Sequence, residues 1–299
     1  MSRIRNYLSL IKFSHTVFAL PFAMIGFFLG IFGTKFMHEP NSPGTQILLI
    51  RFLLVLVCMV TARSSAMAFN RYLDRYFDTR NPRTAIREIP RGIIAPNNAL
   101  RFVIICCFLF MITCWFINPL CFYLSPVALF IILFYSYTKR FTALCHIVLG
   151  IGLSLAPIGA FLAVTGRFEL LPLLFSCAVI CWVSGFDIIY AMQDVDFDRS
   201  ENLYSIPAAV GRKHSLLISS FLHLASAAFV FVAGFIGGFG LWYWAGMILF
   251  CGMLIYQHTL VKSDDLSRVN LTFMTTNGVA SVVFAIFVIA DMFITHKHS

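Results

Sequence analysis

The sequence predicts an all-α integral membrane protein with about nine transmembrane helices, and three observations lead to this fold class. Of the 299 residues, 60% are hydrophobic and only 12% are charged, whereas soluble domains average about 25% charged residues. Apolar stretches long enough to cross a bilayer recur along the whole chain. Short segments of strictly alternating polarity, which membrane β-barrels need, are absent from the sequence.

Nine stretches are candidates for membrane spans, because a helix of about 20 residues crosses the hydrocarbon core of a bilayer. The least distinct boundaries are the turn at 118–119 and the glycine-rich join at 237–240. The first stretch has a basic flank but no small-residue cleavage site, so we expect it to be retained. The predicted spans lie near residues 16–34, 47–70, 101–117, 119–138, 143–165, 170–190, 215–238, 240–260 and 270–294.

The distribution of basic residues among the loops predicts the orientation of the chain. With the N-terminus in the cytoplasm, seventeen Lys and Arg residues fall in cytoplasmic segments and three in outer segments. Arg51 and Arg63 lie within the second span. Cytoplasmic loops of membrane proteins carry an excess of Lys and Arg, so the count supports this orientation. It also accounts for most of the net charge of +9 without a nucleic-acid partner.

Only two loops are both long and highly charged, 71–100 and 191–214. Together with the ends of their helices they hold eight of the thirteen acidic residues. Four predicted spans separate the two loops, and this even number puts both loops on the same side of the membrane. The sequence therefore predicts that the chemistry of the protein takes place at one membrane face.

The two loops show a weak internal repeat, since the spacing of Asp74 and Asp78 recurs 120 residues later in Asp194 and Asp198. Each pair ends the first helix of a block of four predicted spans. Sites in repeated membrane proteins often lie where the repeats meet. We therefore expect two related four-helix halves around a central cavity, with the first span added. The expected units are a single domain over residues 1–299 and helical halves near 47–165 and 170–294.

The first motif combines a carboxamide with two carboxylates at the end of the second span. Asn70, Asp74 and Asp78 are spaced i, i+4 and i+8, so their side chains share one helix face. Arg63 lies seven residues earlier, two helical turns away on the same face. An arginine inside a membrane span marks a functional site or a buried partner by default.

The second motif places Asp187, Asp194 and Asp198 on one face at i, i+7 and i+11. Asp196 points about half a turn away and is expected to be solvated. Because like charges at such spacing repel, the converging oxygen groups of both motifs require cations. Carboxylates with a carboxamide suit Mg²⁺, and substrate phosphates and water complete the coordination shell of the ion. Basic residues on the same side can complete a diphosphate cradle, the candidates being Arg63, Arg75, Arg83, Arg87, Lys139 and Arg140.

Simpler interpretations stand beside this one. A single acidic cluster at a membrane boundary is ordinarily a solvated loop, although two matched clusters on one side make that interpretation weaker. Lys139 and Arg140 can equally serve as a positive-inside anchor. His15, His146 and His223 are scattered and are expected to form no pair. Two further charges, Asp291 and Arg51, lie near predicted outer ends, where they can extend to the interface.

The two motifs and their surroundings resemble the UbiA-type superfamily of intramembrane prenyltransferases, over essentially the whole chain. The matching residues are Arg63 through Asn70, Asp74 and Asp78; Asn81 to Thr84 with Arg87; Thr138 to Thr142; Leu149 and Gly150; and Tyr190 to Asp194 with Ser205 to Pro207. The resemblance implies nine transmembrane helices around a central cavity, in which Mg²⁺ bridges both motifs to a prenyl diphosphate.

The resemblance also implies roles for individual residues. Asp187 becomes an active-site acid that orients or deprotonates the acceptor, and Asp74 and Asp194 join it as catalytic residues. The implied metal ligands are Asn70, Asp74, Asp78, Asp194 and Asp198. The implied substrate-binding residues are Arg63, Asn70, Arg83, Arg87, Lys139, Arg140 and Tyr190.

The expected reaction transfers a polyprenyl group from polyprenyl diphosphate to the ring of 4-hydroxybenzoate or a related aromatic acid, on the way to ubiquinone or menaquinone. The expected location is the bacterial inner membrane, with the N-terminus and the active-site loops in the cytoplasm. The opening segment 12–22 and Glu88 resemble a bacterial branch labelled 4-hydroxybenzoate polyprenyltransferase. The alternatives are 1,4-dihydroxy-6-naphthoate in the futalosine route; haem, a glycerol phosphate lipid or chlorophyllide as acceptor; and, in another class, a secondary transporter.

Overall fold

The computed structural model describes residues 3–11, 19–32, 45–271 and 275–296. These residues form helices and connecting loops and contain no β-strand. The helices are α1 (Arg3–Leu10), α2 (Leu20–Phe32), α3 (Thr45–Leu73), α4 (Arg75–Arg80), α5 (Pro96–Ile117), α6 (Pro119–Thr138), α7 (Cys145–Thr165), α8 (Leu170–Ala191), α9 (Val195–Ser200), α10 (Ile206–Ile236), α11 (Leu241–Leu260), α12 (Val269–Leu271) and α13 (Asn277–His296), with a 3₁₀ turn at Met192–Asp194.

Seven of the described helices are long and apolar enough to cross a membrane, namely α3, α5, α6, α7, α8 with its continuation to Ser200, α10 and α13. The all-α membrane fold is therefore confirmed. The count of nine stays a prediction, because α2 has only 13 described residues and α11 is not among the seven. Residues 12–18 and 33–44, which include the distinctive opening segment and the end of the first predicted span, lie outside the described residues.

Two predicted spans differ from the helices that form. The predicted span 215–238 begins earlier, at Ile206, because the Ser205 side chain caps that helix and a proline occupies its first turn. The helix is then interrupted at Gly211, whose φ of 79° suits a residue without a Cβ atom. The predicted span 270–294 is divided between α12 and α13.

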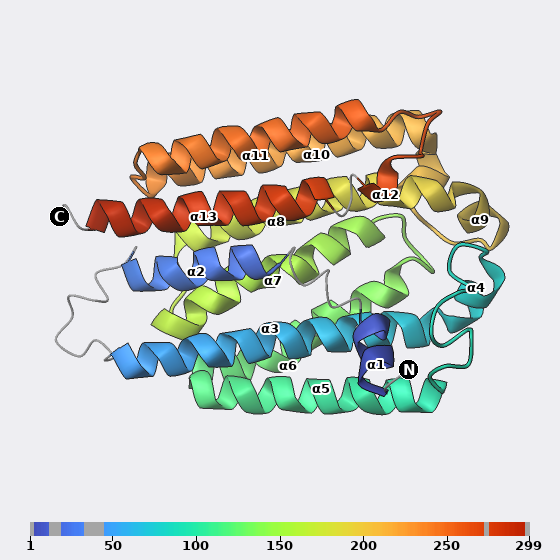
Figure 1. Ribbon diagram of the computed structural model, residues 1–299, viewed down its shortest axis with the longest axis horizontal. Coiled ribbons are helices and arrows are strands. Elements are labelled where there is room, and N and C mark those ends of the chain that lie inside the picture. The colour runs from blue at the N-terminus through green and yellow to red at the C-terminus, as the bar shows by residue number, and fades with distance from the viewer. Residues whose placement is uncertain (1–2, 12–18, 33–44, 272–274, 297–299) are drawn as a thin grey trace.

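The helices pack in two groups on either side of α2 and α7 (Figure 1). Helices α8, α10, α11 and α13 lie together on one side, and α3, α5 and α6 lie on the other. Helix α7 contacts members of both groups and also packs against α2. The short helices α4 and α9 lie at one end of the molecule near α1, whereas the last helix ends at the opposite end. The two acidic motifs are thus at the same end, as the loop count predicts.

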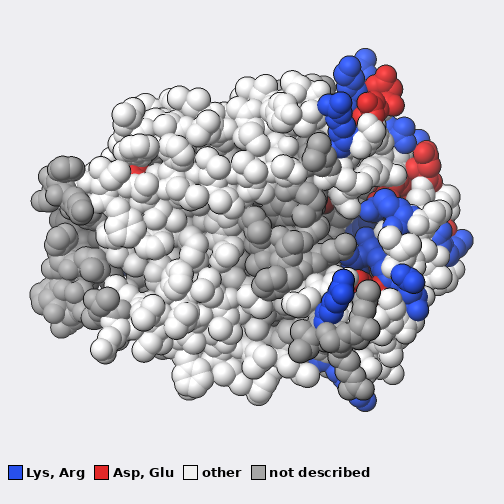
Figure 2. Space-filling model, viewed as in Figure 1, with Lys and Arg blue, Asp and Glu red and all other residues white. Residues whose placement is uncertain are grey.

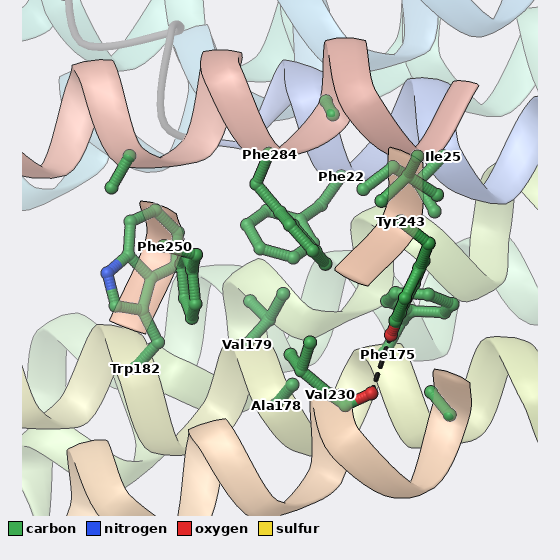
Figure 3. Packing of buried hydrophobic residues seen from close by; sticks show 14 of the residues in the cluster. Phe22, Ile25, Phe175, Ala178, Val179, Trp182, Val230, Tyr243, Phe250 and Phe284 are labelled. Atoms are coloured by element: carbon green, nitrogen blue, oxygen red, sulfur yellow. Dashed lines mark hydrogen bonds between the residues drawn. The ribbon is translucent and has the colours of Figure 1, made fainter. Parts of the chain in front are cut away.

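The largest apolar core joins α2 to α8, α10, α11 and α13 (Figure 3). Phe22 of α2 contacts Trp182 of α8 and Phe284 of α13, with ring centroids 5.3 and 6.1 Å apart. The hydroxyl of the fully buried Tyr243 donates a hydrogen bond to the carbonyl of Val230, which satisfies its polar atom inside the core. This packing holds α8, and with it the second acidic motif, against its neighbours.

A close contact between α7 and α8 depends on Gly150. A Cβ atom at this position would lie 2.6 Å from the Ser184 hydroxyl and 2.7 Å from the Ile180 carbonyl oxygen. Small residues allow helix backbones in membranes to approach closely. The start of α7 is thereby brought against the second half of α8, which carries Asp187.

Of the two charges predicted to extend toward the outer interface, Asp291 is buried, so the prediction is wrong for this residue, whereas Arg51 is partly exposed and also has a partner within the protein. Asp291 of α13 is 2% exposed and accepts hydrogen bonds from the backbone N–H groups of Gly240, Trp242 and Tyr243. It therefore caps the first turn of α11 from another helix. Arg51 donates to the carbonyl of Val164 at 2.6 Å, which ties α3 to the end of α7. Burial in a low-dielectric region makes these satisfied contacts more favourable than solvation.

Replacing Asp291 with alanine should destabilise the protein without a change at the charged end. Three backbone N–H groups would lose their acceptor, and loss of a cap costs about 0.5–2 kcal/mol. Thermal unfolding in detergent should show a lower midpoint for D291A than for wild type. The exposed Asp264, changed to alanine, is the matched control. An unchanged midpoint for D291A would show that Asp291 does not hold α11 in place.

Candidate active site

Both acidic motifs lie where a membrane helix breaks. Helix α3 ends at Leu73 and α8 ends at Ala191, and in each case a six-residue helix follows the break. Asp74 (φ −87°, ψ 5°) precedes α4 and Asp194 (φ −105°, ψ 7°) precedes α9. Both residues therefore have the sparsely populated backbone conformation in which many active-site residues are found. This shared geometry supports the interpretation of two related halves.

The two breaks face a polar cavity of about 710 Å³ at the charged end of the molecule. Figure 2 shows that the Lys, Arg, Asp and Glu residues visible in that view gather at this end, and that the rest of the visible surface is nearly free of them. The residues predicted for the site that line the cavity are Arg63, Asn70, Asp74, Asp78, Arg83, Arg87, Lys139, Arg140, Asp187, Tyr190 and Asp194.

Each of the four aspartates predicted as metal ligands is paired with one Lys or Arg side chain. The loop after α4 supplies Arg87 to Asp78 at 2.6 Å and Arg83 to Asp194 at 2.5 Å. The loop after α6 supplies Arg140 to Asp74 at 2.9 Å and Lys139 to Asp198 at 2.7 Å. The predicted metal ligands and the predicted diphosphate binders are therefore counter-ions of each other.

The Arg83–Asp194 pair is bidentate and crosses between the two motifs. The Arg83 Nε and a terminal nitrogen donate to the two carboxylate oxygens of Asp194. Asn81 adds a third hydrogen bond to the same carboxylate at 3.2 Å. Another guanidinium nitrogen donates to the Tyr190 hydroxyl at 3.0 Å. One arginine thus joins the loop after α4 to the end of α8.

Asp78 lies at the cavity wall outside the membrane spans and is almost completely buried. Burial raises the pKa of Asp78 to about 7, the nearby charge of Asp74 raises it as well, and Arg71 opposes the shift. Its Oδ1 accepts from Arg87, but its buried Oδ2 has no hydrogen-bond partner among the described residues. A buried oxygen without a partner is costly, so this atom is open to a cation or to a hydrogen-bond donor.

The donor set fits Mg²⁺ bound together with a phosphorylated ligand. In the described part of the chain, no three acidic, histidine or cysteine side chains lie close enough to hold a metal by themselves. Mg²⁺ is usually held by one or two carboxylates and completed by substrate phosphates and water. The free Oδ2 of Asp78 and the carboxylates of Asp74 and Asp194 at the cavity wall supply ligands of this type.

A second, apolar cavity of about 460 Å³ adjoins the polar one. Arg63, Tyr135 and Leu149 line both cavities and mark the junction between them. The Arg63 Nε is buried without a hydrogen-bond partner among the described residues, and no ion pair of Arg63 is observed there. Arg63 thus places a positive charge without a counter-ion at the inner end of the polar cavity, next to the apolar one.

Three predicted residues occupy less central positions. Asp198 is fully buried behind the cavity wall, where Ser205 donates to its Oδ2 at 2.9 Å in addition to the pair with Lys139. Asp196 is turned outward with its side chain 88% exposed, as predicted. Arg75 donates to the carbonyl of Tyr72 and does not line the cavity, so it is not part of the diphosphate cradle.

His146 and His223 do not pair with each other, but each has a polar partner on another helix that the sequence analysis did not identify. The Nδ1 of His146, at the start of α7, lies 2.6 Å from the Oδ2 of Asp187 on α8. The Nδ1 of His223 on α10 lies 2.9 Å from the Nε2 of His258 on α11. Both contacts join residues far apart in the sequence, so periodicity within one helix could not reveal them. His15 lies outside the described residues.

The sequence analysis gave no site role to Asn81 or Tyr135, both of which line the polar cavity, although Asn81 belongs to a stretch that resembles the superfamily. Asn81 follows Asp78 by three residues and precedes a proline in a charged loop, and that position was the available signal. Tyr135 lies four residues before Lys139, one helical turn deeper in the membrane. The spacing from Lys139 could have indicated that it faces the same cavity.

Two aspartate motifs that face each other across a cavity lined by basic residues define a helical membrane protein with a charged site at one end of its helices. Residues 19–279 match the UbiA prenyltransferase family, and the chain belongs to this family. It is therefore a prenyltransferase, as the resemblance of the two motifs predicts.

Relatives and solved structures agree with this assignment. The chain is 31% identical to the 4-hydroxybenzoate octaprenyltransferase of Cronobacter sakazakii over 87% of this chain and 89% of that protein. It is 30% identical to the enzyme of the same name from Nitrosomonas eutropha over 82% and 84%. The apo structure of a UbiA homologue from Aeropyrum pernix K1 superimposes with a TM-score of 0.78 at 29% identity, covering 94% of this chain and 98% of that one.

A more distant structure shares the fold. The UbiA homologue from Archaeoglobus fulgidus, solved with DMAPP and Mg²⁺, has a TM-score of 0.74 at 19% identity, covering 97% of this chain and 99% of that one. At this identity the likeness establishes the fold alone.

Mg²⁺ and inorganic pyrophosphate should stabilise the protein together more than either does alone. The reason is that the described acidic groups do not converge on a metal without further ligands. A ligand present at a hundredfold excess over its Kd stabilises the native state by about 2.7 kcal/mol, which thermal unfolding in detergent can detect. Asp78→Asn and Asp194→Asn should abolish the joint effect, whereas Asp196→Asn should preserve it. Full stabilisation by Mg²⁺ alone would contradict the site as described.

Proposed function

We propose that this protein catalyses the Mg²⁺-dependent transfer of a polyprenyl group from polyprenyl diphosphate to the ring of a hydroxyaryl acid. In this reaction the bond between the prenyl carbon and the diphosphate oxygen breaks, and its electron pair leaves with the diphosphate. A new carbon–carbon bond forms to the aromatic ring, and the ring proton passes to a base. Family membership favours this reaction over the transporter alternative.

The observation that carries the proposal is the set of four aspartate–basic pairs around the polar cavity. A ligand that carries both a divalent cation and a diphosphate can replace every partner that it separates. The aspartates then face the cation, and the Arg and Lys side chains face the phosphate oxygens. A ligand with charge of one sign only would leave half of these buried groups without a counter-charge, which is costly.

Each group of residues has a part in binding the donor. Asp74, Asp78 and Asp194 with Asn70 would hold Mg²⁺, and Asp198 would join them if its pair with Lys139 opens. Bound Mg²⁺ would neutralise the leaving diphosphate and so favour its departure. The side chains that bind the phosphate oxygens would be Arg83, Arg87, Lys139 and Arg140, with Tyr190 holding Arg83 in place. The adjoining apolar cavity offers a path for the prenyl tail.

Arg63 is better placed for the acceptor than for the diphosphate. It lies seven residues deeper in α3 than Asn70, which is about 10 Å along a helix. At the junction of the two cavities its charge has no counter-ion among the described residues. We therefore assign it to the carboxylate of the aromatic acid, with the ring held between the donor and Asp187.

The acceptor that the relatives favour is 4-hydroxybenzoate, since proteins about 30% identical carry the name 4-hydroxybenzoate octaprenyltransferase. The second candidate, 1,4-dihydroxy-6-naphthoate, also combines a ring hydroxyl with a carboxylate and suits the same Arg63. We place the enzyme in the bacterial inner membrane with the charged end in the cytoplasm, because the basic loops gather there.

The activity is tested with purified protein in lipid nanodiscs, Mg²⁺ and geranyl diphosphate, offering 4-hydroxybenzoate and 1,4-dihydroxy-6-naphthoate in parallel. One acceptor should gain the mass of one prenyl group, with pyrophosphate released only when that acceptor and Mg²⁺ are both present. Asp74→Ala and Asp194→Ala should abolish the product. No product from either acceptor, or full activity without Mg²⁺, would refute the proposed function.

Arg63→Met should weaken binding of the acceptor and not of the donor. The KM for the aromatic acid should rise by roughly tenfold to a hundredfold, which corresponds to the ~1.5–3 kcal/mol of a hydrogen bond to a charged group. The KM for geranyl diphosphate should stay within about twofold of wild type, and Arg63→Lys should recover part of the loss. A rise confined to the KM for geranyl diphosphate would instead assign Arg63 to the diphosphate.

A further inference from the structure

The contact between His146 and Asp187 joins a buried imidazole to a carboxylate at the wall of the polar cavity. The imidazole is 3% exposed, whereas the Asp187 side chain is 23% exposed and faces the polar cavity. Both residues line the polar cavity, but the imidazole is almost completely buried, whereas the carboxylate is partly open to the cavity. The 2.6 Å contact uses Oδ2 of Asp187, which leaves Oδ1 as the oxygen available to a ligand.

The other ring nitrogen shows which way the hydrogen bond runs. The backbone N–H of Ile206, at the start of α10, points to the Nε2 of His146 at 3.4 Å. A nitrogen that accepts a hydrogen bond carries no proton of its own, so the neutral imidazole has its proton on Nδ1. The Nδ1–H group then donates to Asp187. The histidine is a fixed donor to the carboxylate, since its second nitrogen is already used.

The surrounding helices hold the ring in this orientation. Ser184 on α8 donates to the backbone carbonyl of His146 at 3.1 Å. One turn further along α7, Gly150 lets the two helices approach to a distance that a Cβ atom would prevent. The segment that supplies the Ile206 N–H group also supplies Ser205, which donates to the motif residue Asp198. Three elements, α7, α8 and the start of α10, therefore fix one imidazole.

We propose that His146 is a positioning residue for catalysis, which orients Asp187 as the base that receives the proton of the aromatic acceptor. This inference rests on the proposed function. As the prenyl carbon bonds to the ring, the ring carbon loses its C–H bond, the electron pair of that bond restores the aromatic ring, and the proton passes to Oδ1 of Asp187. His146 gains and loses no proton; it holds Oδ2 and so aims Oδ1.

Three variants separate this role from simple packing, because each keeps a different part of the hydrogen bonding. Asparagine places its amide nitrogen near the position of Nδ1, so His146→Asn can still donate to Asp187. Glutamine reaches the position of Nε2, so His146→Gln can accept from Ile206 but not hold Asp187. His146→Leu removes both contacts. The exposed His214 on α10, changed to asparagine, is the matched control.

Steady-state kinetics with geranyl diphosphate and the acceptor that wild type uses provide the test. For His146→Leu and His146→Gln, kcat should fall by about tenfold to a hundredfold, less than the ~10²–10⁴-fold that a general base supplies. The KM for geranyl diphosphate should not change, and His146→Asn should recover most of kcat. His214→Asn should behave as wild type. Thermal midpoints of all variants are measured in parallel.

A second readout does not depend on turnover. In ¹⁵N spectra of histidine-labelled protein, the signal that disappears in His146→Asn should show a protonated Nδ1 and an unprotonated Nε2, and Asp187→Asn should shift it. Wild-type kcat in His146→Leu, equal losses in all three variants that follow their thermal midpoints, or a protonated Nε2 would each overturn the inference. A wild-type protein without turnover on either acceptor refutes the proposed function and this inference together.

Discussion

The rest of the site depends on the compensation of charge at a membrane boundary. Four aspartates of the two motifs are buried or half-buried, and each has one basic partner within 3 Å. Removing one partner of such a pair leaves a buried charge and costs about 3–5 kcal/mol. The pairs of Arg83 with Asp194 and Lys139 with Asp198 also connect helices from different parts of the chain. The groups that we propose to bind the substrate therefore also stabilise the fold.

This dual use also determines which interactions change when a ligand binds. Because the four side chains proposed to bind phosphate each have an aspartate partner already, ligand binding exchanges partners and does not create new buried charges; these side chains are Arg83, Arg87, Lys139 and Arg140. The net gain on binding is then the difference between two sets of compensated interactions, which is smaller than either set alone. The exceptions have a different character. Arg63 and the Oδ2 of Asp78 lack hydrogen-bond partners among the described residues, so a ligand that reaches them removes an existing cost.

Much of the fold could be predicted from hydropathy, because the length of a membrane helix follows from bilayer thickness. The predicted span 119–138 coincides with α6. The breaks after Leu73 and Ala191 could not be predicted, since the polar residues keep a helical spacing across them. Likewise, the i, i+4 spacing predicts that Asn70 and Asp74 lie close together. This spacing contains no information about the loop after α4. That loop supplies Arg83 to Asp194 across 111 residues of sequence.

The same limit applies to His146, and it shows what kind of residue sequence reasoning overlooks. Asp187 could be predicted because its spacing of seven residues from Asp194 matches the helical periodicity. Its partner lies on another helix, 41 residues away, and reaches it only because Gly150 allows α7 and α8 to approach. A residue that acts through another one has no motif of its own. The position of such a residue is determined by helix packing. That packing depends on glycines and serines whose contacts cannot be predicted until the arrangement of the helices is known.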